Sequence, residues 1–153
     1  MSDPVRRLAE RRALHALDRI YRTVKDRQQG WGCARSGECC QLARTGREPY
    51  AWPLEWIRVR EALARAKRSI PGPREDGACA LLDANGGCSV YEDRPLGCRT
   101  FFCERGAGPT RITRAQITAS MVALERVAQT LDPEVSAPRP LVEWLRGAGG
   151  DPT

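Results

Sequence analysis

The chain has 153 residues, of which 41% are hydrophobic and 29% are charged, with a formal net charge of +6. This balance indicates a soluble, globular protein with one core of ordinary size, and no apolar run approaches the roughly 18 residues of a membrane-spanning helix. Charges spread through the N-terminal segment leave no apolar centre for a signal peptide, so we expect a protein of the reducing cytoplasm.

The first predicted element is a helix from Pro4 to Arg27, with Asp3 as its N-cap and Pro4 in its first turn. His15, the one histidine of the chain, is interpreted as a helix-surface or packing residue rather than a ligand. Apolar residues at three- and four-residue steps form one predicted apolar face: Val5, Leu8, Leu14, Leu17, Ile20, Tyr21 and Val24.

A second helix is predicted to start after Trp52, with Pro53 in its first turn, and to end at "IPGPREDG". The following stretch "CALLDANGGCSVY" predicts a β-hairpin, because Asn85-Gly86-Gly87 is a strong turn signal between two short apolar runs. The two predicted strands carry Cys79 and Cys88.

A third helix is predicted to start at Thr113, which forms a capping box with Gln116, and a short helix from Leu141 to Arg146 follows a linker. The third helix has an apolar stripe that we interpret as core: Ile117, Met121, Leu124, Ala128 and Leu131. The expected fold class is therefore mainly α with a small β-hairpin, and an irregular cysteine-rich metal-binding centre packs on the helices. We expect one compact domain with an amphipathic helix over 1–30, a cysteine-cluster region over 31–105 and a helical segment over 106–153.

All seven cysteines lie between Cys33 and Cys103, and the chain has none elsewhere. In a reducing compartment this pattern favours metal or redox chemistry over disulfides, and an odd count fits poorly with a closed set of disulfides. Thiolates are soft ligands that suit zinc, iron–sulfur clusters or copper(I). We therefore expect the following residues to converge on a metal site: Cys33, Cys39, Cys40, Cys79, Cys88, Cys98 and Cys103.

The cysteine motifs resemble those of the YkgJ-like, or CxxCxxCC, family, whose members are described as zinc- or iron-chelating domains. In "CARSGECC" the residues follow the family's opening C-x2-C-G-x-C-C, with Ser36 in place of the second cysteine. The stretches "CALL", "CSVYEDRPLGCR" and "TFFC" match the later motifs, and the resemblance covers about Gly32 to Cys103. The family implies bound zinc or iron, while a similar cluster in flagellin lysine methylases implies an iron–sulfur centre as the alternative.

Several neighbours of the cysteines are candidate supporting residues. We interpret Arg94 and Arg99 as groups that balance the anionic site or shape it, and Arg35 and Arg105 as surface residues. Tyr91 and Pro95 are expected to fix the local fold, and Trp31, Trp52 and Trp56 are expected to cover the site. Seven thiolates nearly fill two four-coordinate sites. The eighth ligand is left open between a bridging thiolate, water, Ser36 and a carboxylate of Asp76, Asp83 or Asp93.

The sequence thus favours a cytosolic metal-binding protein that chelates zinc or iron in a structural or accessory role, without catalytic activity of its own. One histidine cannot supply a Ser-His-Asp set from its position, and no Gly-rich phosphate loop is present. The first alternative is an iron–sulfur redox or metal sensor, or an enzyme accessory. The second is a nucleic-acid-binding module that uses the basic first helix, which the modest charge excess disfavours. The expected partner is a metal ion, with no membrane association and no protein partner identified.

Overall fold

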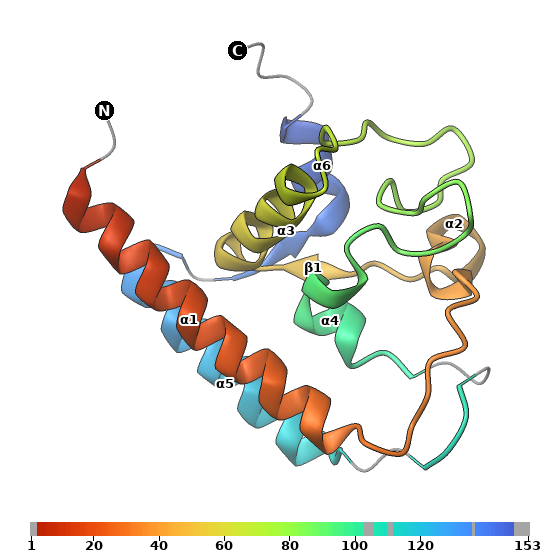
Figure 1. The fold of residues 1–153 in the computed structure, drawn as a ribbon, viewed down its shortest axis with the longest axis horizontal. Helices are drawn as coiled ribbons and strands as arrows, with labels where there is room; N and C mark the ends of the chain where they lie inside the picture. The colour runs from red at the N-terminus through yellow and green to blue at the C-terminus, as the bar shows by residue number, and fades with distance from the viewer. Residues whose placement is uncertain (1–2, 103–105, 110–111, 136, 149–153) are drawn as a thin grey trace.

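Figure 1 shows a mainly α-helical chain with one small antiparallel sheet, in a computed structural model that describes residues 3–102, 106–109, 112–135 and 137–148. This arrangement confirms the predicted fold class. The helices are α1 (Pro4–Arg27), α2 (Leu42–Thr45), α3 (Pro53–Arg65), α4 (Leu96–Arg99), α5 (Arg114–Leu131) and α6 (Leu141–Ala148). Two short 3-10 helices, η1 (Glu38–Cys40) and η2 (Tyr91–Asp93), and the strands β1 (Tyr50–Ala51) and β2 (Arg139–Pro140) complete the fold.

Local capping signals set where the long helices begin. The Asp3 carboxylate accepts a hydrogen bond from the Val5 amide at 3.0 Å, so α1 starts where the sequence predicts. At α5, the Thr113 hydroxyl accepts from the Gln116 amide at 3.2 Å and the Gln116 side chain accepts from the Thr113 amide at 3.0 Å. This confirms the predicted capping box.

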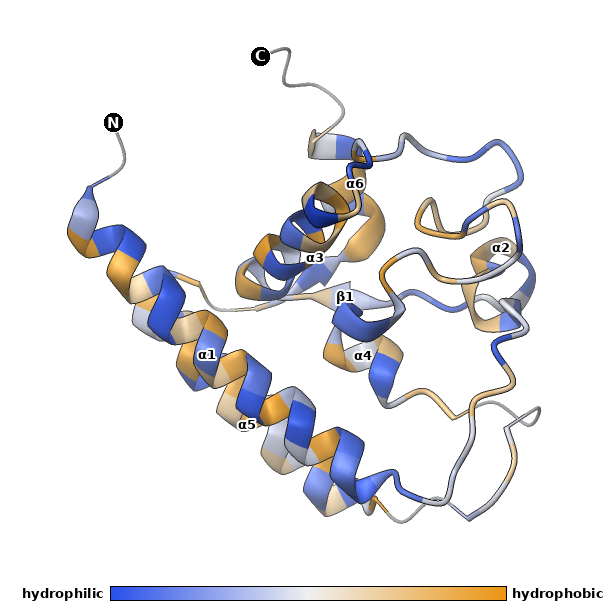
Figure 2. Cartoon of the chain, viewed as in Figure 1, coloured by the Kyte–Doolittle hydropathy of each residue, from blue (hydrophilic) through white to orange (hydrophobic). Residues whose placement is uncertain are grey.

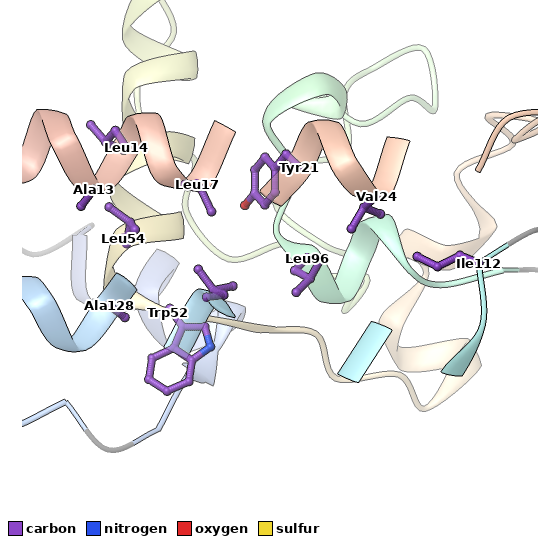
Figure 3. Packing of buried hydrophobic residues seen from close by; sticks show 11 residues of the cluster. Ala13, Leu14, Leu17, Tyr21, Val24, Trp52, Leu54, Leu96, Ile112 and Ala128 are labelled. Carbon is purple, nitrogen blue, oxygen red and sulfur yellow. The ribbon is translucent and has the colours of Figure 1, made fainter. Parts of the chain in front are cut away.

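Helices α1 and α5 run antiparallel side by side and carry one hydrophobic cluster (Figures 1 and 3). Leu17 and Val24 of α1 are fully buried, and they pack in the same cluster as Leu124, Leu54 and Leu96. Figure 2 shows hydrophobic and hydrophilic residues interspersed along the whole length of α1. The amphipathic character predicted for this helix therefore serves to join it to α5.

The predicted apolar faces are wrong at three positions. Val5 is 72% exposed and Leu8 is 42% exposed, because α1 has 24 residues and α5 has 18, so the first turns of α1 extend beyond its partner. On α5, Met121 is 56% exposed. The buried face passes instead through Ser120, one position away around the helix, and continues through Leu124 and Ala128.

A second hydrophobic cluster lies between α3, α6 and the cysteine-rich centre. It includes Trp56 and Val59 of α3, Leu141 and Leu145 of α6, and Cys79. The sheet holds α6 in place, because Tyr50 pairs with Pro140 and Ala51 with Arg139. The Trp144 indole also donates to the Ala51 carbonyl at 2.9 Å. Helix α6 therefore helps to build the surroundings of a cysteine that lies far from it in the sequence.

The predicted hairpin is reduced to a tight turn with one isolated bridge, between Leu82 and Cys88. The Asp83 carboxylate accepts from the amides of Asn85 at 2.8 Å and Gly87 at 3.0 Å, which closes the turn. On one side the chain folds back, as the Leu82 amide donates to the Cys79 carbonyl at 3.0 Å, and on the other side η2 follows. Neither flank stays extended for enough residues to form a strand.

A buried carboxylate joins three helices. Glu55 of α3 is 1% exposed and accepts hydrogen bonds from the Tyr21 hydroxyl at 2.9 Å, the Leu96 amide at 2.6 Å and the Trp52 amide at 3.0 Å. Burial raises the pKa of Glu55, while these hydrogen bonds act in the opposite direction. The network fixes the first residue of α4, the helix that carries Cys98. Within the described ranges, no helix is both long enough and apolar enough to span a bilayer.

Candidate metal centre

Six cysteines line one small cavity of about 60 Å³, several times the roughly 10–15 Å³ that a single water needs. They come from four separate segments of the chain: the stretch from Cys33 through η1, the segment before the tight turn, the segment directly after it, and α4. The six are Cys33, Cys39, Cys40, Cys79, Cys88 and Cys98. Cys103 lies outside the described residues.

A close backbone approach at Gly37 holds the first cysteine loop against the tight turn. Gly37 has a φ of +73°, and a Cβ at this position would lie 2.2 Å from the Gly86 carbonyl oxygen. The loop then closes through the Cys40 amide, which donates to the Gly37 carbonyl at 3.0 Å. The Cys79 amide in turn donates to the Cys40 carbonyl at 2.7 Å. Only glycine fits at position 37, and this contact brings Cys39 and Cys40 beside Cys79 and Cys88.

The adjacent pair Cys39 and Cys40 lies in the short helix η1, and both residues line the cavity. In an extended chain their side chains would point to opposite faces, whereas in η1 both residues line the same cavity. Hydrogen bonding between the two thiols, with a smaller effect of the Arg47 charge, lowers the pKa of Cys39 to about 6. The same hydrogen bond, together with burial, raises the pKa of Cys40. The pair therefore releases its first proton more readily than an isolated thiol, and its second proton less readily.

Arg47 is a residue of the site that no sequence pattern indicates. Its guanidinium donates to the Cys39 carbonyl at 3.0 Å and to the Gly97 carbonyl at 3.1 Å, and it lies 4.2 Å from the centre of the Phe101 ring. It thereby joins the first cysteine loop to α4 and lines the cavity itself. No motif marks this position, because its role depends on contacts across 50 residues of sequence.

The supporting residues of the RP-x2-CR motif divide into two groups. Arg94 lines the cavity, donates to the Tyr91 carbonyl and lies 3.8 Å from the Tyr91 ring centre, and Arg35 covers the same ring at 4.1 Å. Buried Pro95 starts α4, since its carbonyl accepts from the Cys98 amide at 2.9 Å. Arg99 is absent from the cavity lining and instead packs over the Tyr21 ring at 3.9 Å.

Of the three tryptophans expected to cover the site, Trp31 alone lines the cavity, where it meets Phe102 edge-on at 5.0 Å. Trp52 packs in the cluster between α1 and α5, and Trp56 stacks on Trp144 at 6.2 Å. The expectation is wrong for these two, because the N-terminal turns of α3 direct them into the hydrophobic clusters.

The oxygen ligands considered for the eighth position do not line the cavity. Asp76 pairs with Arg74 at 2.7 Å, Asp93 pairs with Arg65 at 2.9 Å, and Asp83 closes the tight turn. Ser36 is exposed and lines a neighbouring hollow of about 210 Å³. Cys33, Cys39, Cys40 and Cys88 also line that hollow, so Ser36 lies at the edge of the cysteine group.

The donor set fits a soft metal, because six of the residues that line the cavity are cysteines. Among the described residues, no group of three or more His, Cys, Asp or Glu side chains is already arranged to hold a metal ion. Burial raises the pKa of Cys79, and it raises the pKa of Cys88 and of Cys98 to about 11. Each of these thiols must release its proton on ligating a metal.

Comparison with known proteins identifies a family for this chain. Residues 32–121 match the family model CxxCxxCC, described as "putative zinc- or iron-chelating domain". The match extends past Cys103 into the first half of α5, farther than the cysteine motifs themselves. No curated protein and no solved structure matches the chain. Since the family model covers more than half of its length, the chain belongs to the CxxCxxCC family, and this membership supports a metal-binding role.

Proposed function

We propose that this protein chelates zinc or iron through the cysteines that line the cavity, in a structural or accessory role in the cytoplasm. The observation that carries the proposal is that six cysteines from four segments line one cavity in a chain of the CxxCxxCC family. All six are free thiols, which accords with a reducing compartment.

The chain's own groups favour a metal cation at this position. The lowered pKa of Cys39 favours a thiolate within the Cys39–Cys40 pair, and the other thiols give up protons as they ligate. Arg47 and Arg94 lie at the cavity wall and offset the negative charge that several thiolates would build up. A bound ion would add cross-links between the four segments that carry these cysteines.

The number of thiols exceeds the four that one tetrahedral zinc ion or one iron–sulfur cluster requires. We propose that Cys79 has a double role, because it also packs in the hydrophobic cluster of α3 and α6. The six described cysteines suffice for one four-coordinate site, and a second such site would need both Cys103 and one further ligand, such as a bridging sulfur.

Elemental analysis of anaerobically purified protein, together with its absorbance spectrum, tests the proposal and selects the metal. We expect at least about one equivalent of zinc in a colourless protein, or iron in a brown protein if the alternative iron–sulfur sensor is correct. Cys39→Ser and Cys98→Ser should each lower the metal content. Ser89→Ala, which lies next to Cys88 and leaves every thiol in place, should not. Protein that contains neither metal, even after anaerobic reconstitution, refutes the proposal.

A further inference from the structure

A polar cleft of about 370 Å³ lies beside the cysteine cavity, and the two share the residues Trp31, Cys33, Tyr91 and Arg94. Its volume falls within the roughly 300–1,000 Å³ range of small-molecule sites. It is formed where the end of α1 meets the first cysteine loop and the segment from η2 to α4. The proposed metal chelation uses Cys33 and Arg94 but gives the rest of this cleft no role.

The cleft carries an excess of positive charge. Lys25, Arg35, Arg94 and Arg99 line it, against two carboxylates, Asp26 and Glu92. Glu92 lies between Lys25, at 3.6 Å, and Arg35, at 3.7 Å. The structure therefore already shows one carboxylate between two cations of this cleft.

Two of the cations are held in place before any ligand binds. The Arg35 and Arg94 guanidinium groups stack on the Tyr91 ring, at 4.1 Å and 3.8 Å from its centre. Arg99 is only 6% exposed, and its Nε is buried without a hydrogen-bond partner. A buried cation with an unsatisfied donor costs free energy, and a nearby anion offsets part of that cost.

We propose that this cleft binds a small oxyanion with at least two negative charges, carried on carboxylate or phosphate groups. Guanidinium groups recognise both kinds of oxyanion through paired hydrogen bonds, and prior ordering by Tyr91 lowers the entropy lost on binding. The incoming anion replaces Glu92 as the ion-pair partner of Lys25 and Arg35. The Glu92 side chain is 64% exposed and can turn into solvent.

The shared residue Cys33 sets the bound anion beside the proposed metal site. An oxygen ligand from this side would suit a site in which Ser36 replaces a thiolate. This consequence rests on the proposed function, whereas binding of the anion does not.

Calorimetric titration of the purified full chain with citrate, and separately with inorganic phosphate, tests the proposal. The titrations are run at about 0.1 M salt, where charges more than about 10 Å apart are largely screened. Metal content is measured on the same samples before and after titration. Loss of anion binding and loss of metal binding are therefore separate results.

We expect saturable one-to-one binding of citrate, of phosphate or of both, and the stronger ligand identifies the class. Lys25→Glu and Arg35→Glu should each weaken it by at least about threefold, and Glu92→Gln should strengthen it by about threefold, the range of a partly exposed ion pair. The matched controls are Arg11→Glu, about 20 Å further along α1, and Glu134→Gln after α5, and both should change binding by less than about twofold. Absence of saturable binding by both probes overturns the proposal, as does equal weakening by Lys25→Glu and Arg11→Glu.

Discussion

Replacing Gly37 by alanine should separate the first cysteine loop from the tight turn. The added Cβ would lie 2.2 Å from the Gly86 carbonyl oxygen, a backbone atom that cannot move without moving the turn. The φ of +73° adds a left-handed conformation, which costs a residue with a Cβ about 1–2 kcal/mol. Overpacking adds about 1–3 kcal/mol, so we expect a total destabilisation of about 2–5 kcal/mol.

Gly46 provides a matched control, because its φ of +66° is similar while nothing lies within 4 Å of its Cβ position. Gly46→Ala should therefore show the conformational cost alone, about 1–2 kcal/mol. The difference between the two variants, measured by urea unfolding, should be about 1–3 kcal/mol. The added Cβ should also push the tight turn, and with it Cys88, away from Cys39 and Cys40. Competitive chelator titration should then show metal affinity reduced about 5- to 150-fold in Gly37→Ala but not in Gly46→Ala. Equal stability of the two variants would refute the packing argument at Gly37.

Four further outcomes follow from the site and its supports. Ser36→Cys should bind metal more tightly, or bind one more equivalent, because it adds a soft thiolate to the hollow that Cys33 and Cys39 also line. Unchanged metal binding in chelator competition would count against a missing ligand at this position. Metal removal should lower hydrogen-exchange protection more in the cysteine-rich centre than in α5, which has its own cap and apolar face, and equal loss in both would contradict this. Arg47→Lys cannot bridge the Cys39 and Gly97 carbonyls together and should cost about 1.5–3 kcal/mol in urea unfolding, whereas the exposed control Arg44→Lys should cost little. Burial raises the pKa of Glu55 above 4.5, so its ionisation lowers the stability of the folded protein as the pH rises through that pKa. The stability advantage of the wild type over Glu55→Gln should therefore be larger at about pH 4 than at about pH 7. An advantage that does not depend on pH would contradict this.

The parts of the fold that follow from local chemistry could be predicted from the sequence. Asp3 and Thr113 cap their helices through side-chain hydrogen bonds to residues two or three positions away, so a short window contains the whole signal. The exposure of Met121 does not follow from the sequence, because the helical period alone does not say which of two adjacent positions faces the partner helix. The exposure of Val5 has a similar cause, since the length of α5 cannot be read from α1.

In the candidate site, too, some residues can be recognised from the sequence and others only from the folded chain. The cysteines themselves are visible in the sequence, whereas the close approach of Gly37 to Gly86 appears only in the folded chain. Arg47 is not, because the carbonyls that it bridges belong to segments that meet only in the folded chain. The buried carboxylate of Glu55 is equally hidden, because it reads as an ordinary charged residue of an amphipathic helix until α1 and α4 pack against it.

The packing of α6 has a consequence for the order of events during synthesis. Leu141 lines the cysteine cavity and packs in the same cluster as Cys79, although about 100 residues separate it from Cys40. At a translation rate of about 5–20 residues per second, the first thiols emerge roughly 5–20 s before the residue that covers them. During that interval the nascent thiols are open to oxidants and to metal ions alike. We therefore expect cellular redox conditions at the ribosome to influence how much of the protein reaches its native state.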